Sequence, residues 1–309
     1  MLQLKAYGLD ELNHVDVKNN PELQLINLKN TALSGIDLTN NRKLICLNLT
    51  NCKLTNINVS NMPDLKQLYL NNNSIESIDL KNNPALFDLF VMKNKLTSLD
   101  LSKNVLLEKI DAAENTLNEL DLSANTAIWY IDVRGNKWNA CQLNDFYYTL
   151  PKYVDPGEEV TGKTTPTKLW IAYGNNENDV EHSETLLAKS KLWIMNYTKD
   201  GDGTGCNEAY ITILPYENGD VTVKDAGNNL VKSGSKVQKN TELTVDATPK
   251  SGYALISVKA NGEDVANNKF TVKQATEVVV KFALASSIGG VERTMATAEG
   301  GNHEINIYT

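Results

Sequence analysis

The sequence predicts a solenoid of short, mostly β coils followed by a small all-β domain. Three observations support this fold class. Leucine-like residues recur every 21 positions in the first part of the chain, a narrow asparagine column recurs with them, and short alternating strands separated by turn residues appear after residue 207. A repeat of fixed length indicates stacked units, because one short coil cannot bury its leucines alone whereas neighbouring coils can bury them together.

Four apolar columns and one polar column define the repeat. The first apolar column is Leu23, Leu44, Leu65, Leu86, Leu107 and Ile128, and apolar columns also follow three, five and ten positions later. The polar column reads Thr31, Cys52, Asn73, Asn94, Asn115 and Asn136. The pattern L-x-x-L-x-L-x-x-N-x-L is the leucine-rich repeat signature. We therefore predict an α/β-type leucine-rich repeat solenoid, mostly β, over residues 1–138.

Two polar columns are interpreted as structural. Inward-turned asparagines at Asn73, Asn94, Asn115 and Asn136 can bond the free backbone groups where each coil bends. The second half of each coil repeats an alternating triplet such as Ile36-Asp37-Leu38, so about six coils with two extended segments each are expected. Its aspartates form a further column, Asp37, Asp79, Asp100 and Asp121. Stacked carboxylates repel one another, which favours a structural or solvated role over a metal or catalytic one.

Residues 139–207 are predicted to be an α/β cap that closes the last coil. Residues 139–153 have apolar positions at helical spacing and end near Pro151; residues 167–174 and 192–198 are expected to be strands, and 183–191 a short helix. Cys141 lies in the predicted cap helix and Cys206 at the end of the cap. We hypothesise a disulfide between them, with free thiols as the alternative; Cys52 is expected to be buried and Cys46 to face outward or pack laterally.

Residues 208–284 are predicted to form a small all-β domain. Strands are expected at 209–216, 219–226, 241–249, 253–262, 269–274 and 277–284. Residues 285–309 are small and polar until a final strand-like EINIYT, and they are interpreted as a linker and the start of an incomplete C-terminal tail.

Two parts of the chain resemble known families. The units LTSLDLSKN (96–104) and LNELDLSAN (117–125), with the cap phrases LNDFYYTLP, TGKT and GDGTGC, resemble leucine-rich repeat proteins that Bacteroidetes bacteria secrete or display on their surface. The phrase TELTVDATPKSGYALISVKANG, followed by FTVKQATEVVVKFA, resembles divergent relatives of the B repeat of listerial internalin B. These resemblances imply an extracellular or cell-surface protein, with the β domain as a spacer or adhesion unit.

Composition and motifs argue against several functions. The net charge of -8 argues against nucleic-acid or anionic-membrane partners, no apolar run approaches the length of a membrane span, and the start MLQLKAYGLD lacks a signal-peptide pattern. His14, His182 and His303 lie in different regions, and no zinc, phosphate-loop or nucleophile-elbow motif is present. Asp200 and Asp202 start like a calcium loop, but Ile211 stands where the loop needs glutamate. We therefore expect no catalytic residue, metal or cofactor.

The outward positions of the first strand in each coil are the predicted binding face. The central column there varies, as Asn27, Asn48, Tyr69, Phe90, Asp111 and Asp132, and the columns beside it vary as well. Tyr69, Phe90 and Met92 are expected to form an exposed apolar patch rimmed by charged and aromatic residues, namely Asp88, Asp111, Tyr130, Asp132 and Arg134. Lateral packing along the sheet is the alternative. A protein ligand, from host or bacterium, is the favoured partner; a carbohydrate stacked on the aromatic rings is the second hypothesis.

Overall fold

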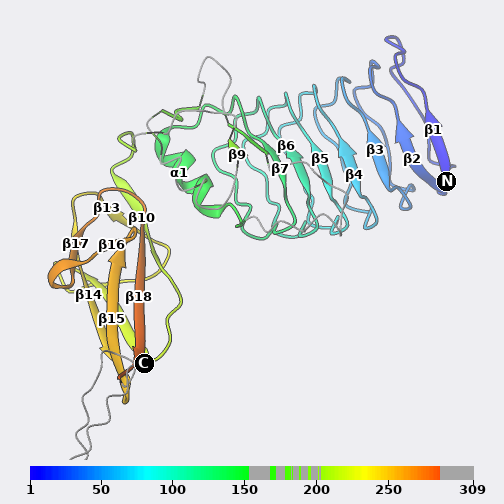
Figure 1. Ribbon diagram of the computed structural model, residues 1–309. Coiled ribbons are helices and arrows are strands. Elements are labelled where there is room, and N and C mark those ends of the chain that lie inside the picture. The colour runs from blue at the N-terminus through cyan, green and yellow to red at the C-terminus, as the bar shows by residue number, and fades with distance from the viewer. Residues whose placement is uncertain are drawn as a thin grey trace, which may run out of the picture. The chain divides into compact units, whose positions relative to one another are not determined.

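Nine parallel strands form one sheet whose order follows the chain from β1 to β9. Figure 1 shows the coils in a row, and each coil adds one strand to the sheet. The strands are β1 (Leu2–Lys5), β2 (Leu23–Asn27), β3 (Cys46–Asn48), β4 (Gln67–Tyr69), β5 (Asp88–Phe90), β6 (Lys109–Asp111), β7 (Tyr130–Asp132), β8 (Lys168–Trp170) and β9 (Ile194–Met195). The predicted leucine-rich repeat solenoid is confirmed, and its sheet extends beyond the six predicted coils at both ends.

This computed structural model describes residues 1–152, 168–171, 178–181, 183, 188, 194–195, 201 and 203–285. The chain divides into two units, Met1–Cys206 and Asn207–Thr309. The predicted tail beyond residue 285 and most of the predicted helix 183–191 lie outside the described residues.

The leucine columns form the core of the first unit. Leu47, Leu68 and Leu89 are register partners on β3, β4 and β5, and each is fully buried. Burying one such side chain stabilises a fold by roughly 1.5–3 kcal/mol, although chain entropy offsets most of the sum. The 21-residue period therefore sets the register of the sheet, because any slip would move leucines out of the core.

The triplets in the second half of each coil form no ladder strands within the described residues. Instead, the polar residue of the triplet makes a local turn. The Oδ1 atom of Asp100 accepts a hydrogen bond from the N–H of Ser102 at 3.0 Å, and Asp37, Asn58, Asp79 and Asp121 bond the residue two positions on in the same way. Side chains that satisfy their own backbone compete with strand pairing. The aspartate column is thus structural.

A second turn recurs just after each strand. The third residue after each of β2 to β7 adopts positive φ, namely Asn30, Asn51, Asn72, Lys93, Glu114 and Gly135. Asparagine and glycine tolerate this left-handed conformation well, which accounts for the residue type in the first three coils and the last.

Helix α1 (Ala140–Thr149) closes the last complete coil. Asn139 caps it with a reciprocal bond to Gln142, at 3.0 Å in both directions. Phe146 and Tyr147 are buried, and the ring of Phe146 lies 5.1 Å from that of Trp138 between centroids. A disulfide joins Cys141 to Cys206 and so ties the end of the unit to this helix. None of the described helices is long and apolar enough to cross a membrane.

The second unit contains two sheets around its own apolar core. One has the order β13-β10-β18-β15-β16 and the other β12-β11-β14-β17. The strands are β10 (Glu208–Ile213), β11 (Gly219–Asp225), β12 (Leu230–Val231), β13 (Ser235–Gln238), β14 (Glu242–Pro249), β15 (Tyr253–Ala260), β16 (Glu263–Asp264), β17 (Lys269–Thr271) and β18 (Thr276–Leu284), with the short helix η1 (Ala266–Asn268) before β17. The sequence prediction missed β12, β13 and β16, which are too short to show a clear alternation.

Gly219 marks a close contact between the two sheets. A Cβ atom at this position would lie 2.2 Å from Cζ of Phe282 on β18. We therefore expect Gly219→Ala to destabilise the second unit by about 1–3 kcal/mol, because the aromatic ring has to move. Faster amide hydrogen exchange in β11 and β18 would measure this loss of stability. In a chain that already carries Phe282→Leu, adding Gly219→Ala should cause a smaller loss. Unchanged exchange in Gly219→Ala would contradict the contact.

Candidate functional site

The asparagine column makes a continuous hydrogen-bonded ladder behind the sheet. In Asn94, Nδ2 donates to the carbonyls of Leu70 at 3.0 Å and Val91 at 2.9 Å, while Oδ1 accepts from the N–H of Ile75 at 3.0 Å. Equivalent sets of bonds are made by Asn73, Asn115 and Asn136. Thr31 and Cys52 at the first two places bond the carbonyl of Leu28. These residues thus hold neighbouring coils together.

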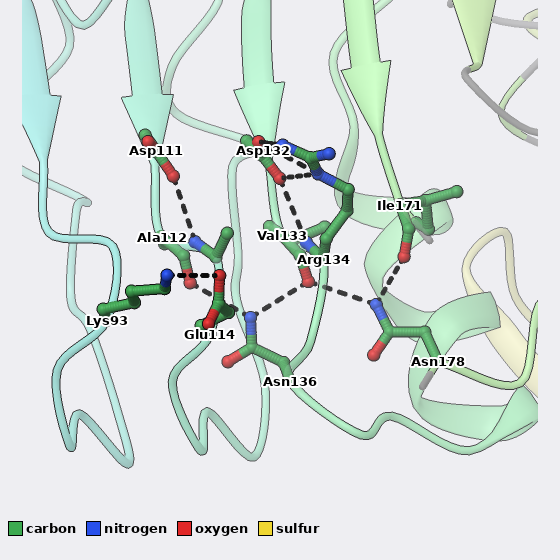
Figure 2. Close-up of polar contacts among 11 residues, drawn as sticks. Lys93, Asp111, Ala112, Glu114, Asp132, Val133, Arg134, Asn136, Ile171 and Asn178 are labelled. Atoms are coloured by element: carbon green, nitrogen blue, oxygen red, sulfur yellow. Dashed lines mark hydrogen bonds and ion pairs between the residues drawn. The ribbon is translucent and has the colours of Figure 1, made fainter. Parts of the chain in front are cut away.

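Asn178 continues this ladder into the cap, as Figure 2 shows beside Asn136. Its Nδ2 donates to the carbonyls of Val133 and Ile171, at 3.1 and 2.7 Å, and its Oδ1 accepts from the N–H of Trp138. The repeat pattern does not indicate Asn178, because it lies eight residues after its strand end, Trp170, whereas Asn136 lies four residues after Asp132.

A second buried asparagine column was also missed. Asn83 donates to the carbonyls of Val59 and Met62, both at 2.9 Å, and the same pattern recurs in Asn41, Asn104 and Asn125. In the sequence, each of these asparagines stands three residues before a member of the first apolar column, namely Leu44, Leu86, Leu107 and Ile128. In one coil Met62 occupies the position of this asparagine, and the neighbouring Asn61 donates to two carbonyls of the preceding coil instead.

The predicted binding face is called here the strand face. It consists of the first and third residues of β3–β7 and the residue two positions after each strand. Tyr69, Phe90, Met92 and Tyr130 are half-buried on it rather than exposed. The rings of Tyr69 and Phe90 lie 5.2 Å apart between centroids, on adjacent strands. The expected exposed patch is therefore corrected to a partly covered one, because neighbouring side chains on parallel strands shield one another.

Asp88 is the centre of one polar network on the strand face. Gln67 donates to both the hydroxyl of Tyr69 and Oδ2 of Asp88 at 2.9 Å, and the Tyr69 hydroxyl lies 3.4 Å from the same carboxylate oxygen. The Nζ atom of Lys109 lies 3.3 Å from Oδ1 of Asp88. Burial and the charge of Asp88 raise the pKa of Tyr69 to about 12. Tyr69 is therefore a neutral hydrogen-bonding group at physiological pH.

Asp132 and Arg134 form a second network. Figure 2 shows Arg134 folded back onto Asp132, with Nε at 2.9 Å from Oδ1 and a second bond from the guanidinium to Oδ2. The guanidinium carbon also lies 4.8 Å from the ring centroid of Trp170 on β8. Asp132 is 1% exposed, so the pair fixes a buried charge instead of providing a free charged rim.

Asp111 lies between these two networks on β6. It is 8% exposed, and its Oδ1 accepts one bond, from the N–H of Ala113 at 3.2 Å. Phe90 and Asp132 are its register partners on either side. Burial, and next the negative charge of Asp132, raise the pKa of Asp111 to about 6.

Three residues that the sequence prediction did not assign to the site take part in it. Gln67 and Lys109 lie on the strand face and hold Asp88, while Trp170 lies outside the repeat and packs on Arg134. Nothing in the repeat pattern indicates these pairings, since they depend on side-chain direction across strands. Tyr130 is half-buried beside Trp129, with ring centroids 6.3 Å apart.

The raised pKa of Asp111 predicts a pH-dependent stability. A carboxyl group whose pKa is higher in the folded chain than the unfolded value near 3.9 stabilises the fold below that value, and this stability is lost as the pH rises through about 6. Asp111→Asn keeps a bond acceptor without the charge. At pH 7.5 it should raise the free energy of unfolding by roughly 1–2 kcal/mol, with little gain at pH 4.5.

Urea unfolding followed by tryptophan fluorescence measures this difference. The matched control is Asp121→Asn, because Asp121 is exposed and asparagine can keep its bond to Ser123. An equal gain at both pH values would contradict the assignment to Asp111.

No group of three or more metal-ligating side chains is present in the described part of the chain. Asp200 and Asp202 of the rejected calcium loop lie outside it. The neighbouring Gly201 is closely packed, since a Cβ there would lie 2.1 Å from the carbonyl oxygen of Ser183.

Comparison with known proteins gives a family match for the second unit and several solved structures that are similar to the chain. Residues 209–286 match the sequence model of the divergent InlB B-repeat domain. No curated protein matches the chain. The chain is similar to the solved structure of InlF from Listeria monocytogenes, with 19% identity over 65% of this chain and 62% of that one and a TM-score of 0.49.

Two further structures are similar at lower TM-scores. Internalin C2 of Listeria monocytogenes is 18% identical over 44% of this chain and 62% of that one, with a TM-score of 0.42. A leucine-rich repeat protein of Leptospira interrogans is 14% identical over 60% and 59%, with a TM-score of 0.38. The chain spans less than two thirds of each of these structures, and an origin in Bacteroidetes stays a prediction. From its own repeats and its matched domain, the chain consists of a leucine-rich repeat solenoid followed by a B-repeat-like domain.

Proposed function

We propose that the first unit binds a protein ligand through the strand face, on or outside the cell surface. The central observation is that the strand face changes from coil to coil while the rest of the coil repeats. The central column runs through Asn48, Tyr69, Phe90, Asp111 and Asp132, whereas the leucine columns and asparagine ladders stay almost constant. A surface that varies along a rigid scaffold can distinguish one partner from another.

The middle of this face has the composition of a binding centre. Tyr69, Phe90 and Met92 present partly accessible apolar area, and hydrogen-bonded charges surround them. Interfaces are often centred on aromatic and methionine side chains within a polar rim. Because Asp88 and Asp132 are already paired, this rim is preorganised and little side-chain freedom is lost on binding.

The disulfide supports a location outside the cytosol, because such bonds persist mainly in oxidising compartments. The B-repeat-like unit would then serve as a spacer or adhesion module that follows the binding unit in the chain.

The test is a pull-down from host and microbial extracts with the wild-type chain and a Tyr69→Ala, Phe90→Ala, Met92→Ala triple variant. A partner that the wild type retains and the triple variant loses supports the proposal. The matched control replaces the exposed residues Glu76, Ser77 and Thr97 with alanine and should retain the partner. A triple variant that binds the partner as well as the wild type would refute the role of this face.

Two further measurements separate the alternatives. Thermal unfolding of the triple variant, followed by tryptophan fluorescence, detects a purely structural role; a large loss of stability would support lateral packing instead. A glycan array tests the carbohydrate hypothesis, which the rings of Tyr69, Phe90 and Tyr130 suggest. Since the Tyr69 and Phe90 rings pack on each other, less of each ring face is open for stacking, which favours the protein ligand.

A further inference from the structure

The charges of the strand face do not balance on β5–β7. Three carboxylates, Asp88, Asp111 and Asp132, lie at successive strands, and two cations accompany them. Lys109 pairs with Asp88, and Arg134 pairs with Asp132. Within the described part of the chain, no lysine or arginine lies at ion-pair distance from Asp111. Among the described residues, Asp111 is therefore the carboxylate of the three without a direct ion pair, and the charge of Arg134 acts on it from a greater distance.

The surroundings of Asp111 make this charge costly in the free protein. The residue is 8% exposed, and among the described residues its carboxylate accepts one hydrogen bond, from the backbone N–H of Ala113 to Oδ1. Oδ2 has no partner among the described residues, and Figure 2 shows Asp111 beside the carboxylate of Asp132 on the next strand. A buried charge without a partner loses hydration without recovering it. A cation from outside would supply the missing interaction.

The other neighbour of Asp111 is apolar. Phe90 is its register partner on β5, and Met92 follows two residues later on the same coil. Lysine and arginine combine a charged end with an apolar stem, which packs on such surfaces while the charge reaches a carboxylate. An inorganic cation would find no further group of ligands there among the described residues.

We propose that the protein ligand inserts a basic side chain, lysine or arginine, whose cation pairs with Asp111 and whose stem packs on Phe90 and Met92. This inference rests on the proposed function and specifies the chemistry of the partner: a protein with an accessible basic residue in its interface. Charge complementarity selects it, because the face lacks one positive charge and the partner provides it.

The probe for this pocket is Nα-acetyl-L-lysine methylamide, titrated into the isotope-labelled full chain at pH 7.5 and followed by NMR. The norleucine analogue, which has the same stem without the charge, is the neutral control probe. We expect the lysine probe to cause saturable shifts of the Ala113 amide and the Phe90 ring. The Asp111→Asn variant should bind this probe at least tenfold more weakly than the wild type. Asp121→Asn, with the same change of charge at an exposed site, should bind like the wild type.

Three results would overturn the proposal: equal shifts with the norleucine analogue, an unchanged affinity in Asp111→Asn, or no saturable shift at these residues. The affinity of the pull-down partner for two variants distinguishes a failure of this inference from a failure of the proposed function. A partner that Asp111→Asn retains at wild-type affinity, but that the Tyr69, Phe90, Met92 triple variant loses, leaves the binding face standing and removes the basic anchor. A partner that the triple variant retains removes the binding face itself.

Discussion

Replacing Asn115 with alanine should lower the free energy of unfolding of the solenoid by roughly 3–5 kcal/mol. Its Nδ2 donates to the carbonyls of Val91 at 3.0 Å and of Ala112 and Ala113 at 3.1 Å, and its Oδ1 accepts from the N–H of Leu96 at 3.0 Å. The residue is 3% exposed. Alanine would leave the N–H of Leu96 buried without a partner, which costs about 1–3 kcal/mol unless water enters. Each of the three carbonyls would lose one of its two donors and keep the other, from Asn94, Asn136 or the N–H of Lys93. Each lost bond costs about 0.5–1.5 kcal/mol.

Urea unfolding monitored by tryptophan fluorescence measures this effect selectively, since every tryptophan of the chain precedes residue 207. The matched control is Asn118→Ala, because Asn118 is exposed and should cost less than about 0.5 kcal/mol. If Asn115→Ala unfolded at the same urea concentration as Asn118→Ala, the ladder would not hold the coils together.

Breaking the disulfide should cause the second large loss of stability. Cys141 and Cys206 are separated by 65 residues, and closing a loop of that length removes entropy from the unfolded chain worth about 4 kcal/mol. The bond ties the end of the unit to α1, so its loss should also expose the cap. We expect Cys206→Ser, or reduction of the wild type, to lower the unfolding midpoint clearly.

The same tryptophan signal, with and without dithiothreitol, measures this loss. Cys46→Ser serves as the control, because Cys46 is a free, half-buried thiol and the variant should respond to reductant like the wild type. A midpoint that dithiothreitol leaves unchanged, with complete reduction shown by a thiol count, would contradict a stabilising bond.

The fold of the first unit could be predicted because each repeat position meets its own counterpart one coil away. Leu68 contacts the equivalent positions Leu47 and Leu89, so the same residue type solves the same packing problem in every coil. Where that equivalence fails, prediction failed as well. Asn178 lies at a different distance from its strand than the asparagines of the repeat do.

The binding face was harder to predict because alternation shows only that a side chain points outward, not how far its neighbours cover it. Asp88 was expected as part of an open rim, yet Gln67, Tyr69 and Lys109 bury it to 4% exposure. Trp170 belongs to the cap, so no repeat column could associate it with Arg134. Lateral pairings between different residue types can therefore be identified only from the three-dimensional structure.

Site-specific photo-crosslinking tests the central claim, that the strand face binds a protein, most directly. A benzoylphenylalanine at Asn48, the register partner of Tyr69, would lie beside the bound ligand, whereas one at the exposed Glu119 would lie away from the strands. We predict that the partner isolated by pull-down forms a covalent adduct from position 48 and none from position 119. Adducts from position 119 alone, or equally from both positions, would contradict binding at the strand face.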